Sequence, residues 1–540
     1  MASKPLEEKG VHRAKLWEIA FYALNNTSTN IYLIMLGSIS YYLVGIVGIG
    51  SVLAGSVMTI MRIWDGVTDP FVGMIVDNTN TKIGKNRPFI IVGQIIMFVS
   101  TFAMLRFIQL IPQGGRFVAF VIIYMIYIVG YTAQCVVTKS AQSCMTNDPE
   151  QRPVFSMFDS VYNTVLMSMF WPVFLSSTLL PKYTLNSAEH GDKLAALVAQ
   201  SPSLEKVITV SEEGVQVLTG FYNPEMWHFT QLVLGITSAV FACCAFIGIS
   251  RKDNVKYFGT GKTERVSFRD YADVLAHNRG IQMLVVAASS DKLAMSAGTN
   301  TTVMMALYGI IFGNYALSGS VSAISGIPIA VLGIVGIGYI ARKMGQKTCL
   351  VIGTWGALGT AAVLAFIIAT GHGGNFVLPT FSLTNLSTYG NLFKGANWSL
   401  MGVVFLLMYI LNRGFAQLSG SIVIPMTADC ADYEVFRSGR YVPGLMGTLF
   451  SFVDKVISSL ATTIVALVYA TIGYKNALPT ENDPYTTGLM ICTIICFLGM
   501  PVIGWILNVV AMKFYPLSKE KMAEIQDEVG RIKAEAMKNK

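Results

Sequence analysis

The sequence predicts an all-α membrane protein with twelve transmembrane helices arranged as two six-helix bundles. The 540-residue chain is 53% hydrophobic and 13% charged, with a mean hydropathy of +0.55, whereas soluble proteins carry about 25% charged residues. Its apolar residues gather into about twelve segments, each long enough to cross a bilayer, which takes about 20 residues. A polar and basic stretch at 251–279 separates the first six segments from the second six.

The ends of the apolar segments give the expected spans. The first six are Leu16–Leu43, Val44–Val76, Pro88–Phe107, Phe117–Cys144, Pro153–Leu180 and Phe229–Ile249. The second six are Ile281–Phe312, Ser318–Ile340, Thr348–Thr370, Trp398–Ala431, Gly444–Tyr474 and Thr487–Phe514. We therefore expect an N-terminal bundle at 1–250 with an outer insertion at 181–228, a cytoplasmic middle loop at 251–280, a C-terminal bundle at 281–515 and a cytoplasmic amphipathic tail at 516–540.

The positions of the basic residues predict the orientation in the membrane. Most of the 39 Lys and Arg residues fall at the two termini and in the even-numbered loops, which places both termini in the cytoplasm. The net charge of +8 is thus a topology signal, and anionic lipid is the macromolecular partner it needs; we expect no nucleic-acid partner. The polar stretch Met1–Lys15 does not resemble a cleavable signal, so we expect the first span to be retained.

Cysteine and histidine positions argue against an enzyme or a metalloprotein. The eight cysteines fall inside apolar segments or at their inner ends, which predicts no disulfide framework, and no Cys/His spacing suggests zinc. No His is expected at membrane depth, so no Ser/His or metal-ligand constellation is available there for hydrolysis. We therefore expect a protein that is not an enzyme and that needs no cofactor.

Gly and basic residues recur at the same turn of each half. After the second expected span the chain reads GMIVD (73–77) and GKNR (84–87), and after the eighth it reads GYIARKMGQK (338–347). This echo is expected for two repeats related by an axis along the membrane normal.

Two carboxylates stand in the middle of the second expected span. Asp65 and Asp69 are four residues apart and share one helical face. Each costs about 2.5–3.5 kcal/mol at a bilayer centre, so acids at this depth are functional candidates. One interpretation is a cation site made of hard oxygen ligands. The other is that one or both acids pair with Arg62.

Two segments outside the spans have a simpler interpretation. The outer insertion is expected to hold a short helix near Asp192–Ala199 and to form a cap without chemistry. The tail carries an apolar stripe and is expected to be a surface helix packed under the cytoplasmic face, with a regulatory partner site as the alternative. The stripe consists of Met522, Ile525, Val529 and Ile532.

Several motifs resemble those of one transporter family. They are RIWDGVTDP (62–70), GMIVD (73–77), GKNRP (84–88), ADCADY (428–433), FVDK (452–455) and FYPL (514–517). With them the chain resembles the glycoside–pentoside–hexuronide:cation symporters, the branch of the major facilitator superfamily that includes melibiose permease and the glucuronide transporters. The resemblance covers nearly the whole chain and implies the major facilitator fold.

The resemblance implies a coupling site. Asp65 and Asp69 take the places of the acids that bind the coupling ion, which is Na+, Li+ or H+, and Thr132 takes the place of a hydroxyl ligand. Lys455 aligns with a lysine near these acids, although it could instead be a structural partner of Asp454.

The expected substrate pocket departs from that of melibiose permease. Its first-span acid falls at Asn26, beside Asn25, and its fourth-span acid at Cys135. Lys139 replaces an aromatic residue and Arg413 appears in mid-span. These changes give donors that attract an anion, which favours an acidic glycoside such as a hexuronide. The expected substrate-binding set is Asn25, Asn26, Tyr131 (by ring stacking), Cys135, Lys139 and Arg413.

Charge balance is the alternative to substrate binding by Lys139 and Arg413. The five basic residues placed inside spans are Arg62, Lys139, Lys292, Arg413 and Lys455, and they are matched by Asp65, Asp69, Asp159, Asp291 and Asp454. Lys139, for example, could simply pair with Asp159.

From the resemblance we expect a monomeric secondary transporter in the bacterial plasma membrane. It would couple entry of Na+ or H+ to uptake of a glycoside or hexuronide by alternating access of its two bundles. An amphiphile or lysolipid carrier of the same superfamily, and a non-transporting membrane sensor, are the alternatives.

Overall fold

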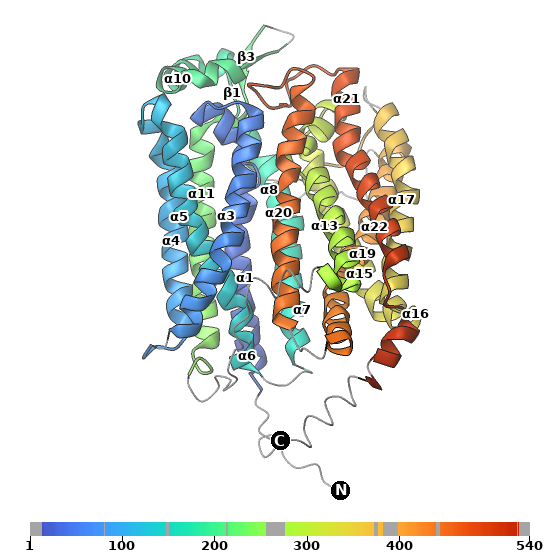
Figure 1. Ribbon diagram of the computed structural model, residues 1–540. Coiled ribbons are helices and arrows are strands. Elements are labelled where there is room, and N and C mark those ends of the chain that lie inside the picture. Colours follow the sequence, from blue (N-terminus) through green and yellow to red (C-terminus); the bar gives the residue numbers. More distant parts are fainter. Residues whose placement is uncertain are drawn as a thin grey trace. The chain divides into compact units, whose positions relative to one another are not determined.

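The computed structural model describes residues 13–79, 81–146, 151–211, 214–254, 276–371, 376–381, 398–438, 443–525 and 527–528. These residues form two compact helical units, which Figure 1 shows with their element labels. Unit 1 holds the chain up to Lys262 together with the segment Gly473–Asp483, and unit 2 holds nearly all of the remainder. Most of the expected middle loop lies outside the described residues.

The long helices of unit 1 run side by side. They are α1 (Leu16–Leu36), α3 (Ser51–Asn78), α4 (Arg87–Arg106), α5 (Gln113–Ser140), α7 (Arg152–Asn163) and α11 (Pro224–Ile249). Shorter helical pieces are α2 (Ile39–Tyr42), η2 (Leu43–Val47), η3 (Ile108–Leu110) and α6 (Gln142–Met145). The helix of α7 continues through η4 (Thr164–Phe170), α8 (Trp171–Phe174), η5 (Leu175–Leu179) and α9 (Leu180–Tyr183).

Small residues allow the helices of unit 1 to approach closely. A Cβ atom at Gly93 would lie 2.8 Å from Cγ of Gln134 and 2.9 Å from the carbonyl oxygen of Gly130, so α4 and α5 touch backbone to backbone there. The most extensive packing in the unit joins α1 to α11 and α4 to α5. Such close contact fixes the side chains of α5, which carries several of the expected site residues.

The turn between the first two expected spans lies later than the hydropathy predicts. We expected one span to end at Leu43 and the next to begin at Val44, but helical structure continues to Val47, Gly48 has a φ of 82°, and α3 begins at Ser51. Only glycine adopts such a left-handed conformation at little cost. The apolar run continues through this turn, so hydropathy alone placed the boundary wrongly.

The outer insertion folds into a small cap on the end of unit 1. The short helix expected near Asp192–Ala199 is confirmed as part of α10 (Ser187–Gln200). It is followed by η6 (Pro202–Val207) and η7 (Gly220–Tyr222), and by a three-stranded antiparallel sheet of order β1-β3-β2. The strands are β1 (Leu185–Asn186), β2 (Thr209–Val210) and β3 (Gln216–Leu218), with Leu185 opposite Leu218.

Unit 2 repeats the pattern of long packed helices. They are α13 (Arg279–Gly298), α15 (Ala316–Val335), α17 (Gln346–Thr370), α19 (Leu400–Ser438), α20 (Pro443–Ala470) and α22 (Met500–Phe514). The connecting pieces are α14 (Thr301–Met304), η9 (Met305–Ile311), η10 (Gly336–Ala341), α16 (Arg342–Met344), α21 (Thr487–Ile494) and η11 (Ile495–Gly499). The closest pairings are those of α17 with α19 and of α13 with α22.

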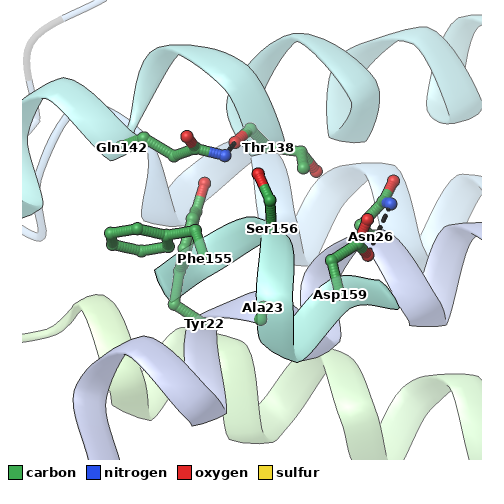
Figure 2. Close-up of a pocket in the computed structure, with 8 residues that line it drawn as sticks. All are labelled: Tyr22, Ala23, Asn26, Thr138, Gln142, Phe155, Ser156 and Asp159. Atoms are coloured by element: carbon green, nitrogen blue, oxygen red, sulfur yellow. Dashed lines mark hydrogen bonds between the residues drawn. The ribbon is translucent and has the colours of Figure 1, made fainter. Parts of the chain in front are cut away.

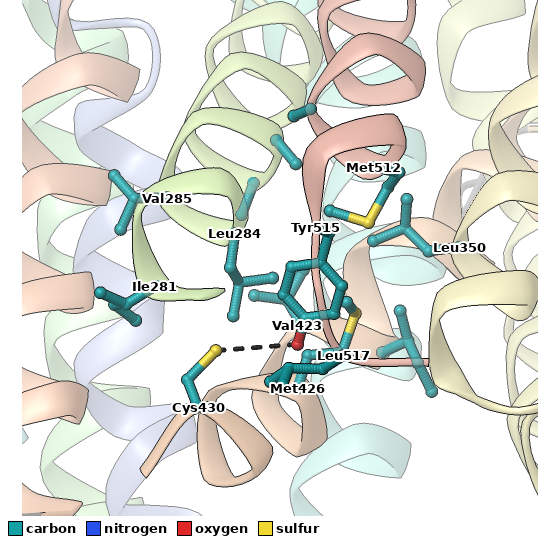
Figure 3. Packing of buried hydrophobic residues seen from close by; sticks show 14 of the residues in the cluster. Ile281, Leu284, Val285, Leu350, Val423, Met426, Cys430, Met512, Tyr515 and Leu517 are labelled. Carbon is teal, nitrogen blue, oxygen red and sulfur yellow. Dashed lines mark hydrogen bonds between the residues drawn. The ribbon is translucent and has the colours of Figure 1, made fainter. Parts of the chain in front are cut away.

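An apolar cluster closes one end of unit 2 (Figure 3). Tyr515 is buried in it and lies 3.7 Å from the thiol of Cys430. Residues 519–525 are helical, and Met522 and Ile525 are buried in the same cluster. The expected packing of the tail against the helices is therefore confirmed for these two residues, whereas Val529 and Ile532 lie outside the described residues.

Eight helices among the described residues are long and apolar enough to cross a membrane, or nine if the bent pair Leu16–Leu36 and Ile39–Val47 is one span. The expected spans that correspond to α3, α13 and α20 are not among them. The helices α3 and α13 carry charged residues in their middle, which lowers their hydropathy, and the described apolar part of α20, Lys455–Ala470, is shorter than a span. The count of twelve and the cytoplasmic position of the termini stay predictions.

Candidate functional sites

The first candidate site surrounds Asp65 on α3. This carboxylate is 1% exposed, and its Oδ1 accepts a hydrogen bond of 3.0 Å from the hydroxyl of Thr132 on α5. The hydroxyl of Thr68 lies 3.2 Å from that of Thr132 and donates to the backbone oxygen of Asp65 at 3.0 Å. The structure therefore brings together Asp65 and Thr132, two of the residues expected to hold a cation, and adds Thr68.

Arg62 lies beside the same carboxylate. Its Nη1 is 3.6 Å from Oδ2 of Asp65, which is an ion pair but is too long for a hydrogen bond. The Arg62 side chain is 37% exposed, so this pair is only partly shielded from solvent. Both interpretations of Asp65, a cation site and an ion pair with Arg62, therefore stay open. Arg62 lies at ion-pair distance from a carboxylate that also accepts a hydrogen bond from Thr132.

A very small cavity adjoins this ion pair. It has a volume of about 10 Å³, close to the space that one water molecule needs. Asp65, Arg62, Tyr131 and Tyr127 are among the residues that line it. Tyr127 is buried, and its hydroxyl has no hydrogen-bond partner among the described residues. The cavity thus offers a carboxylate and a spare hydroxyl oxygen to a species about the size of one water molecule.

For Asp69 and Lys455, the other two expected coupling residues, the structure gives the position and the burial. Asp69 is half-buried one helical turn beyond Asp65 on α3. Lys455 is half-buried on α20 in unit 2, whereas both acids belong to unit 1. The side chain of Asp454, the alternative partner of Lys455, lies outside the described residues.

The second candidate site is a pocket of about 60 Å³ around Asn26 (Figure 2). It lies between α1, α5 and α7. The residues that line it are Tyr22, Ala23, Asn26, Thr138, Gln142, Phe155, Ser156 and Asp159. A pocket of this size holds a few water-sized groups, such as the hydroxyls along one edge of a sugar.

A polar ladder joins α1 to α7 beside this pocket. The amide nitrogen of Asn26 donates to Oδ1 of Asp159 at 2.7 Å, and that of Asn163 donates to the same oxygen at 2.9 Å. One turn further along α1, Asn30 donates to Oδ1 of Asn163 at 3.0 Å. Both helices use residues four apart, which places the paired groups on facing sides of the two helices.

Asn25 is part of the packed interior and does not line the pocket. It is fully buried, and its amide nitrogen donates to the hydroxyl of Thr138 at 2.7 Å. Nearby Gln134 of α5 donates to the carbonyl oxygen of Ile90 at 3.0 Å and accepts from the hydroxyl of Thr29 at 3.0 Å. These bonds tie Asn25 to the framework that carries the pocket.

The remaining expected substrate residues of unit 1 lie along α5. Tyr131 is 9% exposed and lines the small cavity beside Asp65. Cys135 is half-buried. Lys139 lies on α5, but its side chain is outside the described residues, and the expectation that it pairs with Asp159 cannot be followed there.

Arg413 is the expected substrate residue of unit 2. It is 5% exposed on α19, and its guanidinium carbon lies 5.1 Å from the ring centre of Phe497 and 5.5 Å from that of Tyr409. Its Nη1 contacts the sulfur of Met295 at 3.1 Å. Its Nε and Nη2 donate no hydrogen bond to a described residue. The charge is therefore buried and stabilised mainly by aromatic faces.

Asp291 shares the interior of unit 2 with Arg413. It is 5% exposed on α13, and its Oδ2 accepts a hydrogen bond of 3.0 Å from the hydroxyl of Ser419 on α19. This bond joins α13 to α19 inside the unit.

The sequence reasoning missed the position of Asp159. We treated this residue only as a charge partner for Lys139, yet it bonds Asn26 and lines the same pocket. A usable signal was present, because an acid within an expected span is a functional candidate by itself. Spacing also offered one, since Asn26 and Asn30 on one helix match Asp159 and Asn163 on the other.

Comparison with known proteins identifies the family. The family model described as MFS/sugar transport protein matches residues 17–519. The chain is 22% identical over 524 residues to the glucuronide carrier protein homolog of Escherichia coli (strain K12), covering 95% of each chain. It is 20% identical over 509 residues to the isoprimeverose transporter of Lactiplantibacillus pentosus, covering 93% of this chain and 89% of that one.

The fold agrees with this result. The structure matches the crystal structure of a bacterial homologue of the human lysosomal transporter Spinster with a TM-score of 0.55 and 13% identity, over 97% of this chain and 99% of that one. Similarity at this level shows the major facilitator fold alone. The chain is therefore a member of the MFS/sugar transport protein family, in its glycoside–pentoside–hexuronide:cation symporter branch, and is a multi-pass membrane transporter of glycosides and not an enzyme.

Proposed function

We propose that this transporter couples entry of Na+ or H+ to uptake of a glycoside or hexuronide across a bacterial inner membrane by alternating access. The observation that carries the proposal is the buried Asp65 carboxylate, which accepts a bond from Thr132 beside a cavity of about 10 Å³. A buried acid next to a cavity of that size suits one small monovalent cation.

Arg62 gives the cation site a resting partner. In the absence of a coupling ion, the guanidinium 3.6 Å from Oδ2 balances part of the charge of Asp65. A bound Na+ or proton takes over that role, and the partly exposed arginine can then move away from the acid. We propose that Asp69 and the hydroxyl of Thr132 complete the ion's surroundings, and that Lys455 responds to the charge of the site.

Helix α5 connects the proposed ion site to the sugar pocket. It carries Thr132 at the first site and Thr138 at the second, with the buried Gln134 between them. A shift of α5 on ion binding would therefore change the pocket lining. Coupling then follows from reciprocal linkage, since an ion that raises the affinity for sugar must be bound more tightly when sugar is present.

Uptake by reconstituted protein tests the coupling. We expect Asp65→Cys and Asp69→Cys to abolish stimulation of glycoside uptake by an inward Na+ or H+ gradient, while exchange of sugar across the membrane without a gradient continues. Asp192→Cys, which removes an exposed acid from α10, should leave the stimulation unchanged. Full stimulation in both of the first two variants would exclude this site as the place of coupling.

A further inference from the structure

We infer that Asp159 is the group that selects the substrate, and that the pocket around it takes a neutral, hydroxyl-rich glycoside in preference to a hexuronide. The inference rests on the proposed function, and it narrows the substrate class of the same transporter. Its basis is the arrangement of hydrogen-bond acceptors in the pocket shown in Figure 2.

Hydrogen bonds hold the Asp159 carboxylate through its Oδ1, and its Oδ2 is available to a ligand. Both amide donors, from Asn26 and Asn163, bind Oδ1, at 2.7 and 2.9 Å. No described residue donates to Oδ2. Two bonds to one oxygen fix the plane of the carboxylate, so the second oxygen is presented to a ligand in a defined direction without further ordering.

Most of the other polar groups of the pocket have partners within the protein, including the amide of Gln142, which donates to the carbonyl oxygen of Thr138 at 3.3 Å. Asn26 donates its amide to Asp159 and keeps its carbonyl oxygen free to accept. The hydroxyl of Tyr22 donates to the carbonyl oxygen of Val137 at 2.7 Å, and that of Thr138 donates to the carbonyl oxygen of Gln134 at 2.8 Å. Ser156 is the one hydroxyl of the lining that is exposed. Ligand hydroxyls can donate to such a set.

The described lining of the pocket carries a negative charge, which disfavours a carboxylate ligand. Among the described side chains that line it, Asp159 is charged and no Lys or Arg is present. A hexuronide carboxylate would face a like charge with no cation among the described lining residues to balance it, whereas sugar hydroxyls form charge-assisted bonds to Oδ2. The rings of Tyr22 and Phe155, 6.1 Å apart, add apolar faces for the C–H side of a sugar.

Binding to the purified full chain tests the selection. The probes are matched pairs that differ at one group: p-nitrophenyl β-D-glucoside against the β-D-glucuronide, and the galactoside against the galacturonide. We expect the neutral member of a pair to bind at least about tenfold more tightly. Asp159→Asn should weaken neutral binding about 10- to 100-fold, the range for a lost bond to a charged group, and should leave Na+ affinity without sugar unchanged.

A double variant that moves the carboxylate distinguishes an effect on substrate selection from an effect on folding. In the double variant Asn26→Asp/Asp159→Asn the carboxylate moves across the same hydrogen bond, from α7 to α1, so the pair remains complementary. We expect it to recover much of the neutral-sugar affinity that Asp159→Asn loses. Asp192→Asn, the same change at an exposed site on α10, should have no effect.

Three outcomes would overturn the inference. The first is tighter binding of the glucuronide than of the glucoside by the unaltered protein, and the second is unchanged neutral affinity in Asp159→Asn. The third is loss of Na+ affinity in that variant, which would make Asp159 a coupling group. None of the three removes the proposed coupling at Asp65, whereas a lack of binding for all four probes would overturn the proposed function together with the inference.

Discussion

The interiors of the two units treat buried polar groups differently. In unit 1, Gln134 on α5 links α1 and α4 through bonds to Thr29 and Ile90, and Asp159 is held by two amides. In unit 2, the buried guanidinium of Arg413 lies over two aromatic rings, and its Nε and Nη2 donate no hydrogen bond to a described residue. Unit 1 therefore has a pre-organised polar framework, and unit 2 holds a charge that its own described neighbours do not satisfy.

This difference suggests separate roles. A connected network fixes donors and acceptors in place, which a binding site for sugar and ion requires. A buried and incompletely bonded cation is costly to the fold, and such groups persist at functional sites. We therefore expect substitution of Gln134 in unit 1 to lower the stability, and removal of the buried charge of Arg413 in unit 2 to raise it.

The largest expected change follows from breaking the unit 1 network. Gln134→Leu leaves the carbonyl oxygen of Ile90 and the hydroxyl of Thr29 without this partner, and we expect roughly 1–3 kcal/mol of destabilisation. Asn412→Leu is the matched change in unit 2, where the buried amide donates to the carbonyl oxygen of Ala357 at 2.9 Å and to Thr360 at 3.0 Å. Thermal unfolding in detergent measures both.

We expect the melting temperature to fall more for Gln134→Leu than for Asn412→Leu, because the glutamine joins three helices and the asparagine two. Equal losses, or a larger one in unit 2, would show that the two interiors do not differ in this way.

Arg413 gives the second prediction. The double variant Arg413→Met/Asp291→Asn keeps the contact with both rings but removes the buried charge together with the buried acid that interacts with it. We therefore expect the melting temperature to rise by a few degrees while uptake falls about tenfold or more. If the variant instead has a lower melting temperature and transports normally, Arg413 only stabilises the fold, and the proposed difference between the two units is wrong. Arg413→Lys serves as the control for charge, since it keeps the charge but stacks less well.

The fold was largely predictable because hydropathy and motif spacing report long helices directly. The expected helix in the outer insertion and the packing of Met522 and Ile525 are confirmed. The break at Gly48 was not predictable, because the apolar run continues through it and only the backbone conformation shows the turn. Sequence patterns therefore predicted which helices form, but not where each helix begins and ends.

The candidate sites were predictable only in part. The pairing of Asp65 with Thr132 agrees with the family motif. The contact of Asn26 with Asp159 joins residues 133 apart in the chain, and it changes the substrate expectation from an acidic to a neutral glycoside. Such a contact depends on how α1 packs against α7, which no single segment of sequence contains.

The smallest expected effect concerns the segment Gly473–Asp483, which follows α20 in the chain but packs within unit 1. Tyr41 donates to the carbonyl oxygen of Pro479 at 2.8 Å, and Ser51 donates to that of Tyr474 at 2.6 Å. Within the segment, Oδ2 of Asp483 accepts from the backbone of Thr480 at 2.8 Å. These bonds hold the segment on unit 1, and the buried acids of the segment should make this attachment depend on pH.

Burial raises the pKa of Asp483 above its ordinary value of 3.8, although bonds from Thr480 and Tyr474 oppose this shift. A raised pKa in the folded state means that the stabilisation is complete below the unfolded pKa and is lost as the pH rises through the folded pKa. We therefore expect the free energy of unfolding of the unaltered protein, relative to Asp483→Asn, to decrease from about pH 4 to pH 7 by less than about 1 kcal/mol, because the group is half-buried. The melting temperature should decrease with it. Burial also raises the pKa of Glu481, so any remaining slope in Asp483→Asn should disappear when Glu481→Gln is added. A relative melting temperature that increases over this range would show that the ionised carboxylate, and not the protonated one, holds the segment on unit 1.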